Sequence, residues 1–191
     1  MLASGAMFAG LALALGGGHL AIAALAALPA LTRLAHLAVP ELVRRHGSWA
    51  VAAAACWIER AGFLVAAVFG IARPEGWAIP GFLTGIGFGF LGQNLYDASL
   101  AALHTEATPA GTFGRYTATK ARWAAISGLV LGVLASIAVD SAERGLGVPP
   151  HIARALAIVA GVGVHLAVTL PLGRMRAVAR ALALARARGR P

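Results

Sequence analysis

The sequence predicts an all-α integral membrane protein, a polytopic bundle of six transmembrane helices. Its composition is 59% hydrophobic and 12% charged, with a mean hydropathy of +0.78, whereas soluble domains are about half apolar and about a quarter charged. Most of its apolar stretches approach the roughly 20 residues that cross a hydrocarbon core of about 30 Å. The stretches are 2–16, 20–43, 49–72, 77–103, 122–140 and 151–173.

Glycine and proline mark short turns between these stretches, at 16–18, 73–76 and 145–150. Such turns join antiparallel helices. The connection over 104–119 is longer and polar. We expect it to form a structured loop that packs against the ends of the helices.

Small residues recur at a four-residue spacing in two of the stretches. Gly85 and Gly89 lie in the fourth stretch, and Gly128, Gly132 and Ser136 lie in the fifth. This spacing lets helix backbones approach closely in a membrane. We therefore expect both helices to pack tightly, with each other as one option.

Basic residues are concentrated in alternate gaps between the stretches. The gaps that would share one side of the membrane, together with the tail, hold Arg44, Arg45, Arg115, Lys120, Arg122, Arg174, Arg176, Arg180, Arg186, Arg188 and Arg190. Those on the other side hold Arg73, Arg144 and, at a helix mouth, Arg154. Short basic loops stay cytoplasmic. The pattern predicts a multi-pass protein of the cell membrane with both termini cytoplasmic, and the arginine-rich, alanine-rich composition is typical of a bacterial inner membrane protein from a high-GC genome.

We divide the chain into a transmembrane domain, 1–173, and a basic cytoplasmic tail, 174–191. The tail is either an interfacial amphipathic helix or a solvated segment. The net charge of +9 flanks apolar spans without a nucleic-acid module, so we expect anionic lipids at the cytoplasmic face as partners, and no nucleic acid. Cys56 is the only cysteine and the histidines lack metal-ligand spacing, so we expect no metal and no cofactor.

Four ionisable residues interrupt the apolar stretches: Arg33, Glu59, Arg60 and Asp97. A charge at depth costs a few kcal/mol and usually marks function. Glu59 and Arg60 lie roughly 15 Å into the third stretch, near the midplane. Adjacent helical residues point about 100° apart, so each should find its own partner on a neighbouring helix. The alternative is that Arg33 simply neutralises Asp97 or Glu59 and holds helices together.

The gap over 40–47 reads Pro-Glu-Leu-Val-Arg-Arg-His-Gly. It resembles the motif Gly-x-x-x-Asp-Arg-x-Gly-Arg-Arg between helices two and three of the major facilitator superfamily (MFS) of transporters. Arg45 and Gly47 match the Arg-x-Gly core, whereas Arg44 stands in place of the aspartate. The acidic residue of the motif's usual salt bridge is therefore missing at this position.

The later segment Gly114-Arg115-Tyr116 is similar to the Arg-Gly-Arg stretch that leads into helix five of many members of that family, with Phe113 in place of the first arginine. The resemblance extends over the chain as a topology. It implies a non-enzymatic secondary transporter that moves a small solute by alternating access.

In that family helices one and four line the transport path, which sets the order of the candidate residues for substrate or proton handling. The order is Asp97, Gln93 and Asn94, then Arg33 as a counter-ion, then Glu59 and Arg60. Members usually have twelve helices in two halves. This chain resembles the N-terminal half, so we expect a fragment of a longer transporter or a parallel two-fold dimer, and the short first stretch favours a fragment.

Two other functions remain open at the level of sequence. One is a six-helix membrane scaffold or regulatory subunit, which degenerate motifs would also fit. The other is a membrane-embedded hydrolase, for which Ser127 with His165 is the remaining pairing. A transporter requires a water-accessible cleft lined by the fourth helix, whereas a hydrolase requires a compact catalytic cluster.

Overall fold

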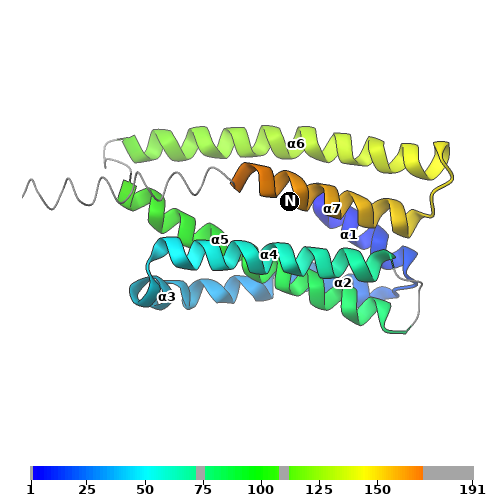
Figure 1. Cartoon of the computed structure of the whole chain (residues 1–191), viewed down its shortest axis with the longest axis horizontal. Helices are drawn as coiled ribbons and strands as arrows, with labels where there is room; N and C mark the ends of the chain where they lie inside the picture. Colours follow the sequence, from blue (N-terminus) through cyan, green and yellow to red (C-terminus); the bar gives the residue numbers. More distant parts are fainter. Residues whose placement is uncertain (1, 72–75, 108–111, 170–191) are drawn as a thin grey trace, which may run out of the picture.

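The chain is described by a computed structural model over residues 2–71, 76–107 and 112–169. Every regular element in these ranges is helical, and the long helices lie side by side (Figure 1). The elements are α1 (Leu2–Ala14), α2 (His19–Thr32), the 3-10 helix η1 (Arg33–Leu37), α3 (Val39–His46), α4 (Ser48–Ile71), α5 (Ala78–Ala107), α6 (Phe113–Gly145) and α7 (Pro150–Thr169).

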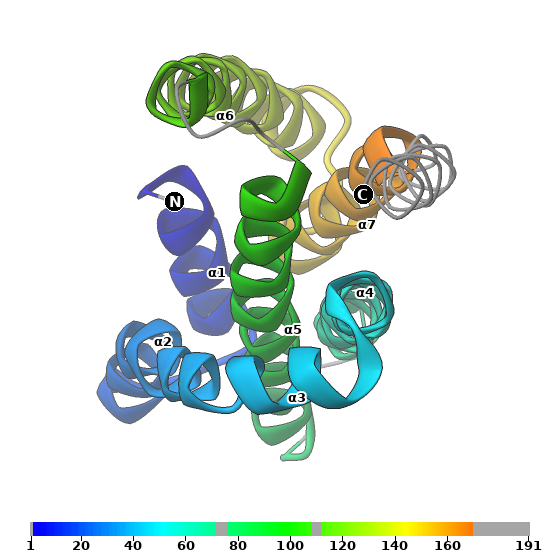
Figure 2. The ribbon, with the colours of Figure 1, turned by 90° about the vertical axis from the view of Figure 1, so that its left-hand side faces the viewer.

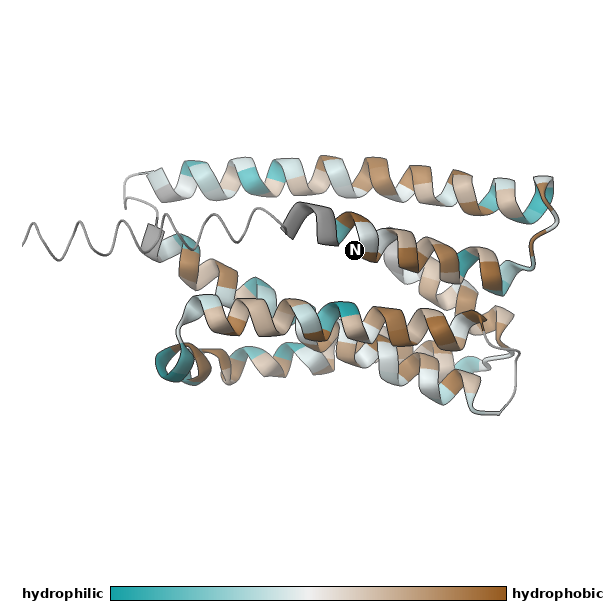
Figure 3. Cartoon of the chain, viewed as in Figure 1, coloured by the Kyte–Doolittle hydropathy of each residue, from teal (hydrophilic) through white to brown (hydrophobic). Residues whose placement is uncertain are grey.

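Three helical segments are long and apolar enough to cross a membrane: 19–37, 48–71 and 114–145. A shorter apolar helix covers 150–165. Along α6 the hydrophobic residues occupy the middle and the hydrophilic residues the two ends (Figure 3). The described part of the chain is therefore all-helical and suited to a membrane, as the composition predicts, and each of the six apolar stretches contains a helix.

The second apolar stretch is not one continuous helix. α2 ends at Thr32, η1 follows, and α3 begins at Val39. Pro40 has no backbone N–H to donate to an earlier carbonyl, so it fits the first turn of a new helix better than the interior of a long one. Gly47 then ends α3 with a φ of 82°, a conformation that glycine adopts at little cost.

The long connection predicted over 104–119 is mostly helical. α5 continues to Ala107, and α6 begins at Phe113 with a polar first turn. Hydropathy marks only the apolar middle of a helix, so it underestimates helices whose ends project beyond the membrane. Residues 108–111, the tail 174–191 and Arg73 lie outside the described residues.

The predicted close packing of the fourth stretch is confirmed, and its partner is α4. A β-carbon built on Gly85 would lie 2.5 Å from the backbone nitrogen of Ala66, and one on Gly62 would lie 2.3 Å from that of Gly89. Only glycine permits such an approach. In the end-on view α5 lies in the middle, with α1, α2, α4 and α7 around it (Figure 2).

Helix α6 lies at the outside of this arrangement (Figure 2) and packs mainly on α7 and α1 rather than on α5. A β-carbon on Gly128 would meet nothing within 4 Å, and all residues over 121–130 are exposed. The small residues of the fifth stretch therefore do not meet the glycines of the fourth. Arg154 of α7 holds the far end of α6 through an ion pair with Glu143 at 3.0 Å.

The buried core joins α1, α2, α4, α5 and α7. Leu11, Phe82, Ile86 and Ala155 are fully inaccessible to solvent. The core thus holds α1, α4, α5 and α7 together.

Candidate functional site

Two charged residues lie buried in the middle of α4. Glu59 is 3% exposed and Arg60 is 6% exposed, and the middle of α4 shows as a hydrophilic patch between hydrophobic ends (Figure 3). α4 is 24 residues long, so these residues lie roughly 17 Å from either end. Charged residues are rarely buried unless they are paired, so Glu59 and Arg60 are expected to have partners within the fold.

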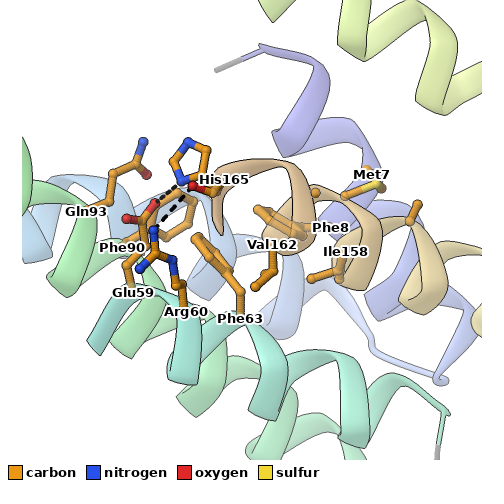
Figure 4. A pocket seen from close by; sticks show the side chains of 12 residues that line it. Met7, Phe8, Glu59, Arg60, Phe63, Phe90, Gln93, Ile158, Val162 and His165 are labelled. Carbon is orange, nitrogen blue, oxygen red and sulfur yellow. Dashed lines mark hydrogen bonds and ion pairs between the residues drawn. The ribbon is translucent and has the colours of Figure 1, made fainter. Parts of the chain in front are cut away.

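Both partners come from one residue of α7. Glu59 Oε1 lies 3.4 Å from Nδ1 of His165, and Arg60 Nη2 donates to the backbone carbonyl of His165 at 3.3 Å (Figure 4). The Arg60 guanidinium carbon also lies 5.6 Å from the ring centroid of Trp57. Adjacent residues of α4 thus reach a neighbouring helix, as expected, but they reach the same one.

The approach of α5 to α4 sets the position of Glu59. A β-carbon on Gly92 would lie 2.2 Å from the Glu59 backbone nitrogen, so the two backbones are in contact at this level. Gln93, the next residue of α5, faces the same space as Glu59 (Figure 4). Backbone contact between two long helices holds the carboxylate more precisely than a loop would.

These residues line a cavity of about 220 Å³ between α1, α4, α5 and α7 (Figure 4). Its polar part is formed by Glu59, Arg60, Gln93 and His165. Its apolar part includes Met7, Phe8, Phe63, Phe90, Ile158 and Val162. The Phe8 ring stacks on Phe63, with centroids 5.9 Å apart, and meets Phe90 edge to face at 6.0 Å. The cavity is therefore amphipathic, with aromatic walls beside a charged cluster.

Two buried side-chain atoms of the cluster, Glu59 Oε2 and Arg60 Nε, make no hydrogen bond among the described residues. Glu59 Oε2 is buried and accepts none there, although Oε1 faces His165. Buried polar atoms of native proteins are nearly always satisfied by protein, water or ligand. The His165 side chain is 54% exposed, so the polar part of the cavity lies next to solvent or lipid.

The other residues predicted from sequence do not line this cavity. Asn94 donates to Thr32 Oγ1 at 2.9 Å and to the Phe90 carbonyl at 3.0 Å, and so ties α5 to α2. Asp97 is exposed one turn beyond Gln93, and Arg33 is exposed at the start of η1. No ion pair in the described ranges joins Arg33 to Asp97 or Glu59. Glu59, Arg60 and Gln93 are thus the members of the set that the fold brings together.

From sequence, His165 is considered as the partner of Ser127 in a hydrolase and is not placed with Glu59 and Arg60. Its signal was present, because an isolated histidine in an otherwise apolar stretch requires a polar partner in a membrane. No spacing along the chain pairs residues 59 and 165. Only the packing of α4 on α7 brings them together.

The arginines of the 40–47 segment pair within α3. Glu41 accepts from Arg44 Nε at 2.8 Å and Nη2 at 2.6 Å, and also from Arg45 Nε. These bonds hold the pKa of the Glu41 carboxyl below its ordinary value of 4.5, and the bond from Arg44 has the larger effect. Glu41 thus neutralises part of the positive charge of Arg44 and Arg45. Gly114 and Arg115, the later motif residues, lie exposed in the first turn of α6.

Ser127, the serine considered for hydrolysis, donates to a carbonyl of its own helix, and so do Ser99 and Ser136. Ser99 donates to Leu95, Ser127 to Trp123 and Ser136 to Gly132, at 2.7–2.9 Å. This bonding is ordinary for serine in apolar helices. In the described part of the chain no three histidine, cysteine, aspartate or glutamate residues are grouped to hold a metal ion.

Comparison of the chain with models of protein families, with curated proteins and with solved structures finds no match. The function is therefore argued from the cavity and from the arrangement of the helices.

Proposed function

We propose that this chain is an integral membrane transport protein that moves a small solute by alternating access. Its helices would cross the bilayer six times, with both termini in the cytoplasm. The basic residues support this orientation: Arg44 and Arg45 lie in α3 and Arg115 in the first turn of α6, at one end of the bundle, whereas Arg144 lies in the last turn of α6 at the other (Figure 1). Short basic segments stay on the cytoplasmic side.

The observation that carries the proposal is a cavity at mid-helix depth, lined by the buried charges of Glu59 and Arg60. Placing charges at that depth costs free energy, and in membrane proteins they usually mark a path for a substrate, an ion or a proton. A purely structural pair would not need an open space of about 220 Å³ beside it. Function in transport explains both the charges and the space.

The major facilitator type is the form of transporter that the sequence resembles. Its first and fourth helices line the path, and here α1 and α5, which correspond to them, contribute Met7, Phe8, Phe90 and Gln93 to the cavity. The charges nevertheless come from α4, the third of the apolar stretches. We therefore propose a half-transporter of this type whose polar site is displaced toward α4 and α7, completed by a second six-helix half.

The test is solute flux in proteoliposomes of the purified full chain. Vesicles that contain a pH-sensitive dye are challenged in turn with small amines, carboxylates, amino acids and sugars, each also supplied with a radiolabel. We expect one class to accumulate, and replacement of Gly161, which lines the cavity, by Trp to stop it. The control is Gly128→Trp, which faces open space on α6. No flux above protein-free vesicles for any class would refute transport by this chain paired with a second copy of itself.

A second function has one observation in its favour. The apolar window of α6 is 0% buried, so this part of the helix is available to another membrane protein, as a scaffold or regulatory subunit would require. Such a subunit would be active without an open cavity. In that case Gly161→Trp would leave its effect on the partner intact, whereas a transporter would lose its activity.

A further inference from the structure

The charged cluster and the aromatic walls of the cavity together define the chemistry of a ligand. We propose that the cavity between α1, α4, α5 and α7 binds a small amphipathic amine, with its N–H group donating to Glu59 Oε2 and its apolar body lying against Phe8, Phe63 and Phe90. The inference rests on the proposed function, because it names the solute class of the same cavity.

The first step is the unsatisfied acceptor. Glu59 Oε1 faces His165, whereas Oε2 is buried and accepts no hydrogen bond from the described residues. A carboxylate oxygen accepts hydrogen bonds, so its missing partner is a donor. Hydrogen bonds to charged groups are the stronger class, which favours an ammonium over a hydroxyl as that donor.

The second step concerns charge. Arg60 is directed toward the His165 carbonyl and the Trp57 ring, so its guanidinium already contacts protein groups. An anionic ligand at Oε2 would place two carboxylates together, which is unfavourable. A cationic ligand would instead place its charged end against the Glu59 carboxylate. The faces of the aromatic rings attract cations as well.

The third step is shape. Met7, Ile158 and Val162 complete an apolar wall around the three rings, and such a wall gains from covering a hydrocarbon or aromatic body. The volume of about 220 Å³ lies below the roughly 300 Å³ at which sites for drug-sized molecules begin. The ligand is therefore a small solute with a single ring or a short branched chain.

The test compares three ligands with the same ring and different head groups: 2-phenylethylamine, 2-phenylethanol and 3-phenylpropionate. Binding to the full chain in lipid nanodiscs is measured by calorimetry, with empty nanodiscs as the blank. We expect the amine to bind about tenfold more tightly than the other two. Equal affinities, or tighter binding of the carboxylate, would overturn the proposal.

Glu59→Gln keeps the shape of the side chain and removes its charge. We expect it to abolish the advantage of the amine over the alcohol, a loss of about tenfold or more, and Asp140→Asn, an exposed carboxylate on α6, to retain it. Because Glu59→Gln leaves Arg60 buried without that carboxylate, Val162→Phe is the second variant. It should weaken all three ligands alike, and unchanged affinities in both variants would overturn the site.

The two proposals fail differently. Flux of another solute class that is blocked by Gly161→Trp would uphold transport and refute the amine. Tight amine binding that depends on Glu59, without flux of any solute, would uphold the ligand site and refute transport by the chain paired with itself.

Discussion

A β-carbon on Gly92 would lie 2.2 Å from the backbone nitrogen of Glu59. At this point α4 and α5 are in backbone contact, directly beside the carboxylate that lines the cavity. Gly62, Gly85 and Gly89 extend the contact along the helices. The site is thus built on two long helices whose separation is set by glycine.

We predict that Gly92→Ala separates these helices. The added methyl group would meet backbone atoms, which cannot move aside as a side chain can, so we expect a loss of about 1–3 kcal/mol in the free energy of unfolding. The measurement is unfolding in mixed detergent and dodecyl sulfate micelles, followed by circular dichroism.

The matched control for this variant is Gly128→Ala on α6, where an added β-carbon meets nothing within 4 Å. It should be neutral or slightly stabilising, because alanine is the better helix former. Equal effects of the two substitutions would mean that α4 and α5 are not in backbone contact at Gly92.

Arg154 fastens α6 to the rest of the bundle. It pairs with Glu143 at 3.0 Å and donates to the Gly10 carbonyl of α1, and both side chains of the pair are mostly buried, at 26% and 19% exposed. We predict that Arg154→Ala lowers the free energy of unfolding by about 1–2 kcal/mol. Amide hydrogen exchange in the last turns of α6 should also accelerate.

Arg144→Ala is the comparison for this prediction. Arg144 pairs with Asp140 one turn away on the same helix, at 80% and 55% side-chain exposure, and such pairs contribute under about 0.5 kcal/mol. If Arg144→Ala lowers the free energy of unfolding as much as Arg154→Ala does, the contacts of Arg154 with α1 and α6 are not what holds the C-terminal end of α6.

The cluster in α3 should respond to acid. The bonds from Arg44 and Arg45 lower the pKa of Glu41 below 4.5, so they stabilise α3 above that pH, and this stabilisation is lost as the pH falls through the lowered value. We predict a Glu41 titration midpoint below 4.5, measured by carbon-13 chemical shifts of its carboxyl group.

Arg44→Ala should raise that midpoint more than Arg45→Ala does, because the Arg44 bond is the larger cause of the shift. A midpoint at the ordinary value in the parent chain would show that the three side chains do not pair in solution.

The orientation of the chain is open to cysteine labelling. With the buried Cys56 replaced by Ala, single cysteines beside Arg44 and Arg115 should react with an impermeant maleimide only from the cytoplasmic side. Cysteines beside Arg144 should react only from outside. The reverse pattern would invert the topology. Labelling of all three positions from one side would exclude the proposal that successive loops alternate between the two sides of the membrane.

The residues that line the cavity could be predicted from the sequence only in part. Glu59 and Arg60 stand out in the sequence as charges in an apolar stretch, and their burial agrees with the depth computed from helical rise. Their order among the candidates followed the family resemblance, which favoured Asp97, Gln93 and Asn94. In the fold Gln93 lines the cavity. Asn94 instead bonds to Thr32 of α2, because adjacent residues of a helix point in different directions, and Asp97, one turn beyond Gln93, is exposed.

Composition and hydropathy by themselves determined an all-helical, membrane-suited chain and the approximate positions of its helices, because each apolar stretch is a local property. The spacing of Gly85 and Gly89 likewise predicted a close contact, but not that its partner would be Gly62 of α4. Only the tertiary structure decided that His165 meets Glu59 and that α6 packs outside the other helices. Those outcomes depend on contacts between segments far apart in the chain, which no local pattern encodes.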